Sequence, residues 1–317
     1  MLSEPKAVLV TGATGFVGSH LVQRLTNEGY QTHILLRTKS DPWRIADILP
    51  KLKAHNVDLT DREGLVKLME EVRPNFIFHL ATAGVYGGKS LPDQDLLKIN
   101  LGGFLNLVEA TNDLEYSLFV NTGSSSEYGP KNEAMKEGDV CQPSNMYGIT
   151  KLAATLYGQA VAATHKKPIV TLRLFSPFGS HDDAKRFMAI AVSGGIKNEE
   201  LILSNPTAVR DFIYIDDVID AYLQCMSKAE ALRGQVLNIG SGIEIGIPSL
   251  CEKLKEIGKF TNTIRKEPGQ PRLGESPSWQ ADITKAKKLL GWQPKRSLEE
   301  GLEKTITWFR ENLKSYE

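Results

Sequence analysis

The sequence predicts an α/β protein built on a doubly wound parallel sheet. Strand-like and helix-like segments alternate through the first half, and a glycine-rich loop separates the first strand from the first helix. The chain of 317 residues is also long enough to bury a large core, with about two domains. Repeated strand–helix–strand units of this length are typical of a parallel sheet with helices on both faces.

The individual elements follow from local pattern. Strands are expected where short runs are apolar or β-branched, and helices where apolar residues recur every three or four positions. Gly29 and Pro74 end the first two helices. The predicted strands are Ala7–Val10, Thr32–Leu36, Asn75–Leu80, Ser117–Val120 and Ile169–Leu174, and the predicted helices are Phe16–Asn27, Leu65–Val72, Ile99–Ala110, Met146–Ala163 and Ser297–Asn312.

Composition and charge exclude several classes of protein. Lys+Arg and Asp+Glu both number 38, so no basic field indicates nucleic acid or an anionic membrane as a partner. The three cysteines form no C-x-x-C pair, which argues against disulfides or a metal site and indicates a reducing, cytoplasmic location. No apolar run approaches the ~18 residues of a membrane span.

The loop between the first strand and the first helix is typical of a dinucleotide-binding turn. It reads T-G-A-T-G-F-V-G from 11 to 18, with G-x-x-G-x-x-G spacing. Glycines permit a tight turn close to a pyrophosphate, and the helix N-terminus adds free N–H groups and partial positive charge. We expect Gly12, Thr14, Gly15 and Gly18 to contact the cofactor; a glycine-rich turn without a ligand is the alternative.

The end of the second strand bears on the choice of cofactor. NAD-binding chains usually place an acidic residue there for the ribose 2′-hydroxyl. Here the segment reads I-L-L-R-T-K-S from 34 to 40, with no acid before Asp41. Arg37 would bind a 2′-phosphate, which favours NADP(H) while leaving NAD(H) possible; a solvated basic turn is the alternative. Asp58 and Leu59, after a later strand, are expected near the adenine.

The domain plan follows from the loss of regularity in the second half, where polar loops separate fewer recognisable elements. We expect a Rossmann-type, dinucleotide-binding domain over residues 1–175, joined again by residues 211–240. Residues 176–317 would mainly form a smaller, loop-rich substrate-binding lobe.

A tyrosine and a lysine one helical turn apart indicate acid–base chemistry. Tyr147 and Lys151 belong to Y-G-I-T-K at the start of a predicted helix and share one face. A free tyrosine titrates near pH ~10, and a nearby ammonium favours its phenolate. The serine cluster G-S-S-S-E-Y-G at 123–129 follows a predicted strand. A hydroxyl there can hold a substrate oxygen against the tyrosine.

Together these motifs resemble the extended short-chain dehydrogenases/reductases, and within them the nucleotide-sugar epimerase/dehydratase group. The segment R-D-F-I-Y-I-D-D at 210–217 supports the resemblance, and D-I-T-K-A at 282–286 and L-G-W-Q-P at 290–294 extend it over nearly the whole chain. It implies an NAD(P)-dependent enzyme, a nucleotide-diphosphate sugar as substrate, and a homodimer paired through apolar helices around 96–110 and 146–163.

The resemblance also assigns roles to single residues. Ser124, Tyr147 and Lys151 match the family's catalytic set. The further cofactor contacts that it implies are Phe16, Val17, Leu80, Ala81, Thr82, Asn100 and Phe175, besides Tyr147 and Lys151 themselves. The substrate contacts that it implies are Ser124, Ser125, Ser176, Arg186, Arg210 and Arg272, the arginines holding the diphosphate. The family usually has asparagine at the Ser176 position, and a structural ion pair is the alternative role for each arginine.

Two reactions at the sugar C4 stay open. The group's 4,6-dehydratases carry an acid pair where this chain has Ser125 and Ser126, and its epimerase–reductases carry cysteine at the Ser126 position. These departures disfavour both of those reactions. Because Arg37 indicates NADPH and the segment at 123–129 resembles that of GDP- and CDP-6-deoxyhexose reductases, a 4-keto-6-deoxyhexose reductase is the favoured interpretation. A 4-epimerase that resembles UDP-glucose 4-epimerase and retains NAD+ is the alternative, and a non-catalytic dinucleotide sensor is a minor third.

Overall fold

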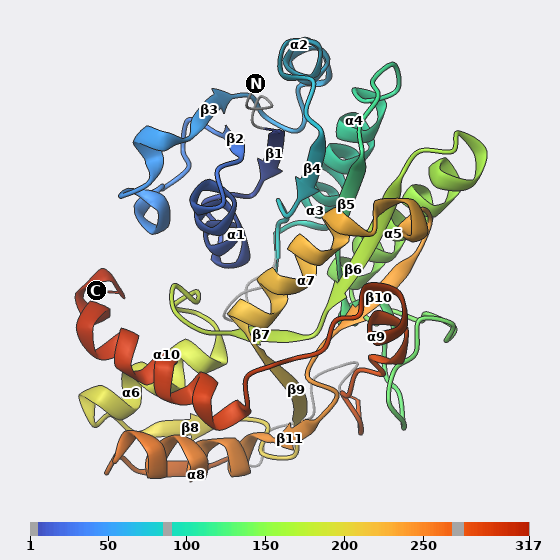
Figure 1. Cartoon of the computed structure of the whole chain (residues 1–317). Helices are drawn as coiled ribbons and strands as arrows, with labels where there is room; N and C mark the ends of the chain where they lie inside the picture. Colours follow the sequence, from blue (N-terminus) through green and yellow to red (C-terminus); the bar gives the residue numbers. More distant parts are fainter. Residues whose placement is uncertain (1–5, 85–90, 268–275, 317) are drawn as a thin grey trace.

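A seven-stranded, fully parallel sheet forms the centre of the computed structural model, which describes residues 6–84, 91–267 and 276–316 (Figure 1). Its strand order is β10-β6-β5-β4-β1-β2-β3. The strands are β1 (Ala7–Thr11), β2 (Gln31–Leu36), β3 (Lys53–Asn56), β4 (Phe76–His79), β5 (Leu118–Ser124), β6 (Ile169–Leu174) and β10 (Val236–Ile239). The order reverses between β1 and β4, so the predicted doubly wound fold is confirmed, and ligand crevices form at such reversals.

Helices cover both faces of this sheet. The helices are α1 (Phe16–Asn27) and α7 (Ile215–Ser227) on one face and α2 (Arg62–Val72), α4 (Gly103–Glu109) and α5 (Met146–Thr164) on the other. Side chains alternate between the two core layers: Val8 and Val10 pack on the side of α1, whereas Leu9 packs on the side of α5. The alternation of apolar residues along the strands therefore reflects burial on both faces of the sheet.

Two predicted elements differ most from the structure in their bounds, whereas the others agree within three residues at each end. The strand expected to end at Val120 continues to Ser124, because the polar residues Asn121–Ser124 pair with β6 and the Asn121 side chain donates to Thr171 Oγ1 at 3.2 Å. The helix expected over 99–110 begins at α3 (Asp93–Leu96) and passes through a π-helical stretch, Leu97–Gly102, into α4. That stretch carries the buried Asn100.

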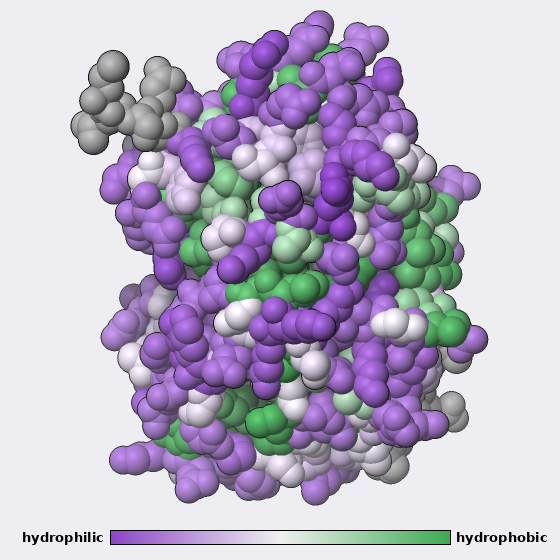
Figure 2. Space-filling model, turned by 45° about the vertical axis from the view of Figure 1, so that its right-hand side comes forward, coloured by the Kyte–Doolittle hydropathy of each residue, from purple (hydrophilic) through white to green (hydrophobic). Residues whose placement is uncertain are grey.

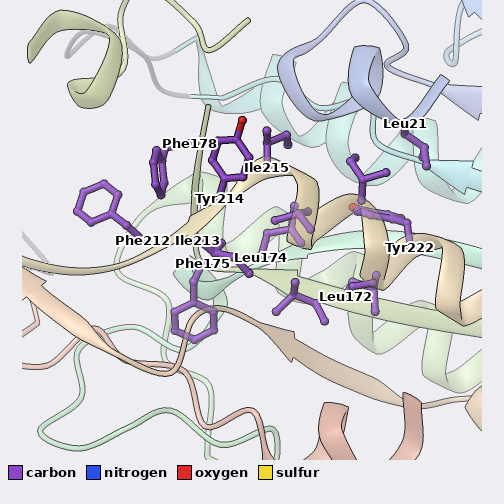
Figure 3. Packing of buried hydrophobic residues seen from close by; sticks show 14 of the residues in the cluster. Leu21, Leu172, Leu174, Phe175, Phe178, Phe212, Ile213, Tyr214, Ile215 and Tyr222 are labelled. Atoms are coloured by element: carbon purple, nitrogen blue, oxygen red, sulfur yellow. The ribbon is translucent and has the colours of Figure 1, made fainter. Parts of the chain in front are cut away.

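The second half is more regular than the loop-rich lobe that the sequence predicts. Its further elements are β7 (Ser176–Phe178), α6 (Phe187–Lys197), β8 (Leu201–Leu203), β9 (Val209–Tyr214), β11 (Glu244–Gly246), α8 (Ile247–Gly258), β12 (Ile264–Lys266), α9 (Thr284–Leu290) and α10 (Leu298–Asn312). Strands of three residues leave too short a pattern to recognise. Around them Phe178 meets Phe212 and Tyr214 edge-on, with ring centroids 6.1 and 5.7 Å apart (Figure 3).

No helix in the described ranges is long and apolar enough to span a membrane.

One buried carboxylate joins three segments of the second half. On β9, Asp211 accepts hydrogen bonds from the backbone of Ser241 (2.6 Å) and Gly242 (2.9 Å), in the turn that follows β10. It also accepts from Ala281 N at 3.0 Å, in the segment that precedes α9. The Ala281 donor is buried and the Ser241 and Gly242 donors are partly buried, so all three lose a well-placed acceptor when the carboxylate is removed, and Asp211 fixes how the segments meet.

We therefore expect Asp211→Ala to destabilise the protein by about 3 to 5 kcal/mol, because several buried N–H groups lose their acceptor. The urea midpoint of unfolding measures the change. Asp113→Ala, at an exposed position, is the control and should leave the midpoint unchanged; a similar midpoint for both variants would refute the role of Asp211.

Candidate active site

The carboxyl ends of the central strands open into one cleft of about 1500 Å³. The predicted site residues that line it are Gly12, Thr14, Gly15, Phe16, Val17, Gly18, Arg37, Asp58, Leu59, Leu80, Ala81, Thr82, Ser124, Ser125, Tyr147, Phe175, Ser176, Arg186 and Arg210. Asn100 and Lys151 are buried and are not part of the lining. Arg272 lies outside the described residues. Sequence positions more than 190 residues apart thus meet on one surface.

The glycine loop is pressed against the chain that follows β4. Gly12 has a φ of +74°, and a Cβ there would lie 2.5 Å from Ala81 N. A Cβ on Gly18 would collide with the carbonyl oxygen of Gly12. Ala81 N also donates to Thr11 Oγ1 at 3.3 Å, and this hydroxyl bonds His79 Nδ1 at 2.9 Å. The start of α1 and the end of β4 therefore form one rigid backbone cradle.

Buried groups behind this cradle fix its shape. Burial, with the positive charge of Lys151 as a lesser cause, lowers the pKa of His79 to about 3, so its imidazole is neutral. Asn100 Oδ1 accepts from Ala83 N (2.7 Å) and from Thr82 Oγ1 (3.1 Å), while its Nδ2 donates to Thr150 Oγ1 (3.1 Å). Asn100 thus ties the loop after β4 to helix α5, and it acts as a bridge behind the cleft.

The serine cluster forms a short 3₁₀ turn, Ser125–Glu127, instead of continuing as extended chain. Ser124, the last residue of β5, is 9% exposed, and its Oγ accepts from Ser126 N at 3.1 Å. Glu127 Oε1 accepts from Ser124 N at 2.8 Å, which closes a capping box. Ser125 Oγ accepts from the indole N–H of Trp279 at 3.0 Å.

Helix α5 starts directly against this turn. Asn145 caps it, accepting from Gly148 N at 2.8 Å. A Cβ on Gly148 would lie 2.5 Å from the carbonyl oxygen of Ser126, so only glycine allows the two segments to approach this closely. Tyr147 stands in the first helical turn and, like Ser124, lines the cleft. The partial positive charge of the helix N-terminus favours a phenolate there.

Lys151 follows Tyr147 by one helical turn and is only 4% exposed. Burial lowers the pKa of its ammonium to about 8, and the negative charge of Glu127 opposes that shift. A tyrosine and a serine hydroxyl at the cleft, backed by a buried lysine, can move a proton to or from an oxygen of a bound molecule.

The arginines occupy different surroundings. Arg186 donates to Asp182 Oδ1 and to the carbonyl of Pro177, each at 2.8 Å, so it forms the structural ion pair that was its alternative role. It still lines the cleft, 5.3 Å from the ring of Phe16. The guanidinium of Arg210 lies 4.7 Å from the ring of Trp279.

Sequence reasoning missed several residues of the cleft. Trp279 contacts both Arg210 and Ser125. The sequence feature that could have indicated it is its position just after a loop rich in proline and glycine. Lys98 also lines the cleft. The contact between Arg44 and His181 was missed too: Arg44, which lines the cleft as well, donates to the carbonyl of His181 at 2.8 Å and so spans the two halves of the chain. No metal-binding group of three or more His, Cys, Asp or Glu occurs among the residues described.

A backbone cradle at the reversal point of a doubly wound sheet, next to a serine, a tyrosine and a lysine, defines a dinucleotide-dependent enzyme of the short-chain dehydrogenase/reductase class. The chain belongs to the NAD dependent epimerase/dehydratase family, whose model matches residues 8–240. The resemblance inferred from the motifs is thereby confirmed.

Relatives match along almost the whole chain. A UDP-glucose 4-epimerase from Mycolicibacterium smegmatis is 29% identical over 315 residues, which cover 95% of this chain and 98% of the relative. The structure of a UDP-glucose 4-epimerase from Thermotoga maritima with UDP-glucose is 28% identical, with a TM-score of 0.89, covering 97% of this chain and 99% of that one. A UDP-glucuronic acid 4-epimerase from Bacillus cereus, in complex with UDP-glucuronic acid and NAD, is 27% identical, with a TM-score of 0.86, covering 96% and 99%.

We expect Gly12→Ala to weaken dinucleotide binding by more than about tenfold, because the methyl group would strain the backbone and separate it from Ala81. Fluorescence titration with the dinucleotide measures this. Gly29→Ala is the matched control: Gly29 also has a positive φ, +83°, but nothing lies within 4 Å of its added Cβ. That variant should lose about 1 kcal/mol of stability and bind normally; equal binding by the two variants would contradict the cradle.

Proposed function

We propose that the protein is an NAD-dependent 4-epimerase of a nucleotide-diphosphate sugar. The observation that supports the proposal is that Ser124 and Tyr147 line the same cleft, while the buried Lys151 follows Tyr147 by one helical turn behind it. Relatives that are 27 to 29% identical over most of their length are 4-epimerases. This corrects the preference for a reductase, because the comparisons favour the alternative that the sequence left open.

The cleft fits a dinucleotide at the glycine loop. The bare backbone of Gly12, the start of α1 and the close approach of Ala81 leave room for a pyrophosphate and offer it N–H donors. Leu80, Thr82 and Phe175 would surround the nicotinamide end, and Asp58 and Leu59 the adenine end. An oxidised nicotinamide held there would supply the hydride acceptor for the sugar C4, and the hydride would reach the opposite face after the keto sugar has turned over in the cleft.

The residues of the chain would move the proton and hold the oxygen. Tyr147, as the phenolate, takes the proton of the C4 hydroxyl and later gives it back to the ketone oxygen. Ser124 Oγ donates to the same oxygen and keeps it aimed at Tyr147. The Lys151 ammonium stabilises the phenolate, and its pKa of about 8 places the loss of that charge just above neutral pH.

The other end of the cleft would hold the nucleotide part of the substrate. We propose that Arg210 and Arg272 bind the diphosphate, that Arg186 contributes from its ion pair with Asp182, and that Ser125 and Ser176 contact the sugar. In this arrangement residues 1–175, with 211–240, bind the dinucleotide and residues 176–317 mainly bind the sugar nucleotide.

A homodimer through the helices on one side of the sheet also belongs to the proposal. Leu97, Ile149 and Leu156 are 38%, 45% and 55% exposed on the π-helical stretch and α5. Figure 2, which turns that side of the molecule forward, shows apolar groups between hydrophilic ones. Such exposed apolar side chains favour pairing with a second copy, which the sedimentation coefficient of the purified protein tests.

A 4-keto sugar reductase that uses NADPH is the second candidate, and Arg37 is the observation that favours it. Arg37 is exposed and lines the cleft just after β2, where NAD-binding chains usually have an acid. Hydrogen bonds from Thr60 chiefly, then the charges of Arg37 and Lys98, lower the pKa of Asp58, so this corner of the cleft is rich in positive charge. A 2′-phosphate would suit it.

Denaturing the purified protein and identifying any released dinucleotide separates the two candidates. Stoichiometric NAD+ is expected for the epimerase, because the cofactor must stay bound through the whole cycle. An empty site that binds NADPH at least ten times more tightly than NADH would instead establish the reductase and the role of Arg37.

We expect Tyr147→Phe to lower turnover of the sugar nucleotide by about 1,000-fold while the dinucleotide stays bound, because only the transferred proton is lost. Steady-state rates and cofactor content measure both quantities. Tyr157→Phe, on the same helix but away from the cleft, should keep full activity; unchanged turnover in the Tyr147 variant would show that Tyr147 does not transfer the proton.

A further inference from the structure

Glu127 is a fully buried carboxylate directly behind the serine turn, with 0% of its surface exposed. Its Oε1 accepts from Ser124 N at 2.8 Å, and its Oε2 accepts from Arg173 Nε at 2.8 Å. The Arg173 side chain is itself only 4% exposed. Gly123 makes room for this pair, because a Cβ there would lie 2.5 Å from Glu127 Oε1. A buried ion pair therefore lies behind the last residue of β5.

The ion pair is held in place from the far side. The guanidinium of Arg173 lies 4.4 Å from the ring of Tyr128, and Tyr128 Oη donates to Asn238 Oδ1 at 2.7 Å, which connects β6 to β10. Beyond it, Glu137 accepts from Asn238 N at 2.8 Å. Glu127 thus has little freedom to move away from Ser124.

The same carboxylate acts on Lys151. Burial lowers the pKa of the ammonium to about 8, and the charge of Glu127 counteracts it. The other titratable groups around Lys151 are His79 on β4, which is neutral, Tyr147 on α5, and Arg173 on the opposite side of Glu127. A nearby anion favours the charged form of a buried ammonium, and Glu127 is the carboxylate that has this effect on Lys151.

We propose that Glu127 is a positioning residue with two functions: it holds the backbone of Ser124 so that Oγ faces the cleft, and it keeps Lys151 charged beneath Tyr147. The proposal rests on the proposed function for the roles of Ser124, Tyr147 and Lys151 in the reaction. The carboxylate contacts neither the cleft nor a bound molecule, so it acts through these residues.

Three variants separate the two functions. Glu127→Gln keeps an acceptor for Ser124 N but removes the charge. Glu127→Asp keeps the charge but is too short to reach Ser124 N and Arg173 together. Glu137→Gln is the matched control, since Glu137 belongs to the neighbouring network but contacts neither Ser124 nor Lys151.

The titration of Lys151 is measured by NMR in protein with ¹³Cε-labelled lysine, assigned from the Lys151→Met variant. We expect Glu127→Gln to lower the pKa of Lys151 by about one unit and to move the alkaline limb of kcat/KM to lower pH by the same amount. Glu127→Asp should keep that limb and lose about tenfold in kcat, because Ser124 is no longer held. Glu137→Gln should change neither.

Unchanged titration of Lys151 in Glu127→Gln, or an equal shift in Glu137→Gln, would overturn the proposal. If Glu127→Gln does not fold with Arg173 unpaired, the double variant Glu127→Gln with Arg173→Met removes both charges. A smaller fall in the pKa of Lys151 is then expected, because the loss of the Arg173 cation partly offsets the loss of the carboxylate. The NMR titration needs no substrate. If the pKa of Lys151 falls in Glu127→Gln but the unmodified protein has no epimerase activity, only the proposed function is refuted. If the unmodified protein is an active epimerase but the pKa of Lys151 does not change in Glu127→Gln, only the role of Glu127 is refuted.

Discussion

The close contact between the first turn of α5 and the serine turn after β5 is the constraint on which the site depends. Gly148 lies against the carbonyl of Ser126, and a side chain at this point would force the two segments apart. That separation would part Tyr147 from Ser124, although each would keep its own secondary structure. The placement of the Ser124 and Tyr147 hydroxyls therefore depends on a backbone contact between Gly148 and Ser126, in which neither hydroxyl takes part.

The two ends of the cleft are stabilised in different ways. At the glycine loop, positive φ and bare backbone let β1 and the end of β4 meet, and neutral polar groups such as Thr11 and His79 fill the space behind them. At the serine turn, a buried ion pair between Glu127 and Arg173 fills the space behind the backbone. A pyrophosphate at the glycine loop needs backbone N–H donors, which the neutral groups behind the loop leave available. Proton transfer at the serine turn needs side chains with a defined charge, which the buried ion pair helps to set.

The parts of the structure that the sequence predicts well are those with local signals. Alternating elements predicted the parallel sheet, and the spacings of the glycine loop and of Tyr147 and Lys151 predicted which residues lie in the cleft or directly behind it.

The end of β5, the π-helical stretch before α4 and the three-residue strands were missed, because long-range pairing decides them. Trp279 and the contact of Arg44 with His181 were missed for the same reason, since the partners lie more than 65 and 135 residues away in the chain. The burial of Glu127 was missed as well, because a 3₁₀ turn places its side chain behind β5.

The fate of the hydrogen at the sugar C4 tests the central claim most directly, because Ser124, Tyr147 and Lys151 are proposed to return the hydride to the carbon that lost it. The purified protein would be incubated with UDP-glucose carrying deuterium at C4, without added cofactor, and the products examined by NMR. The account predicts the C4 epimer with the deuterium still at C4. An epimer that has lost the deuterium to solvent, or no epimer from this or any other sugar nucleotide offered, would contradict it.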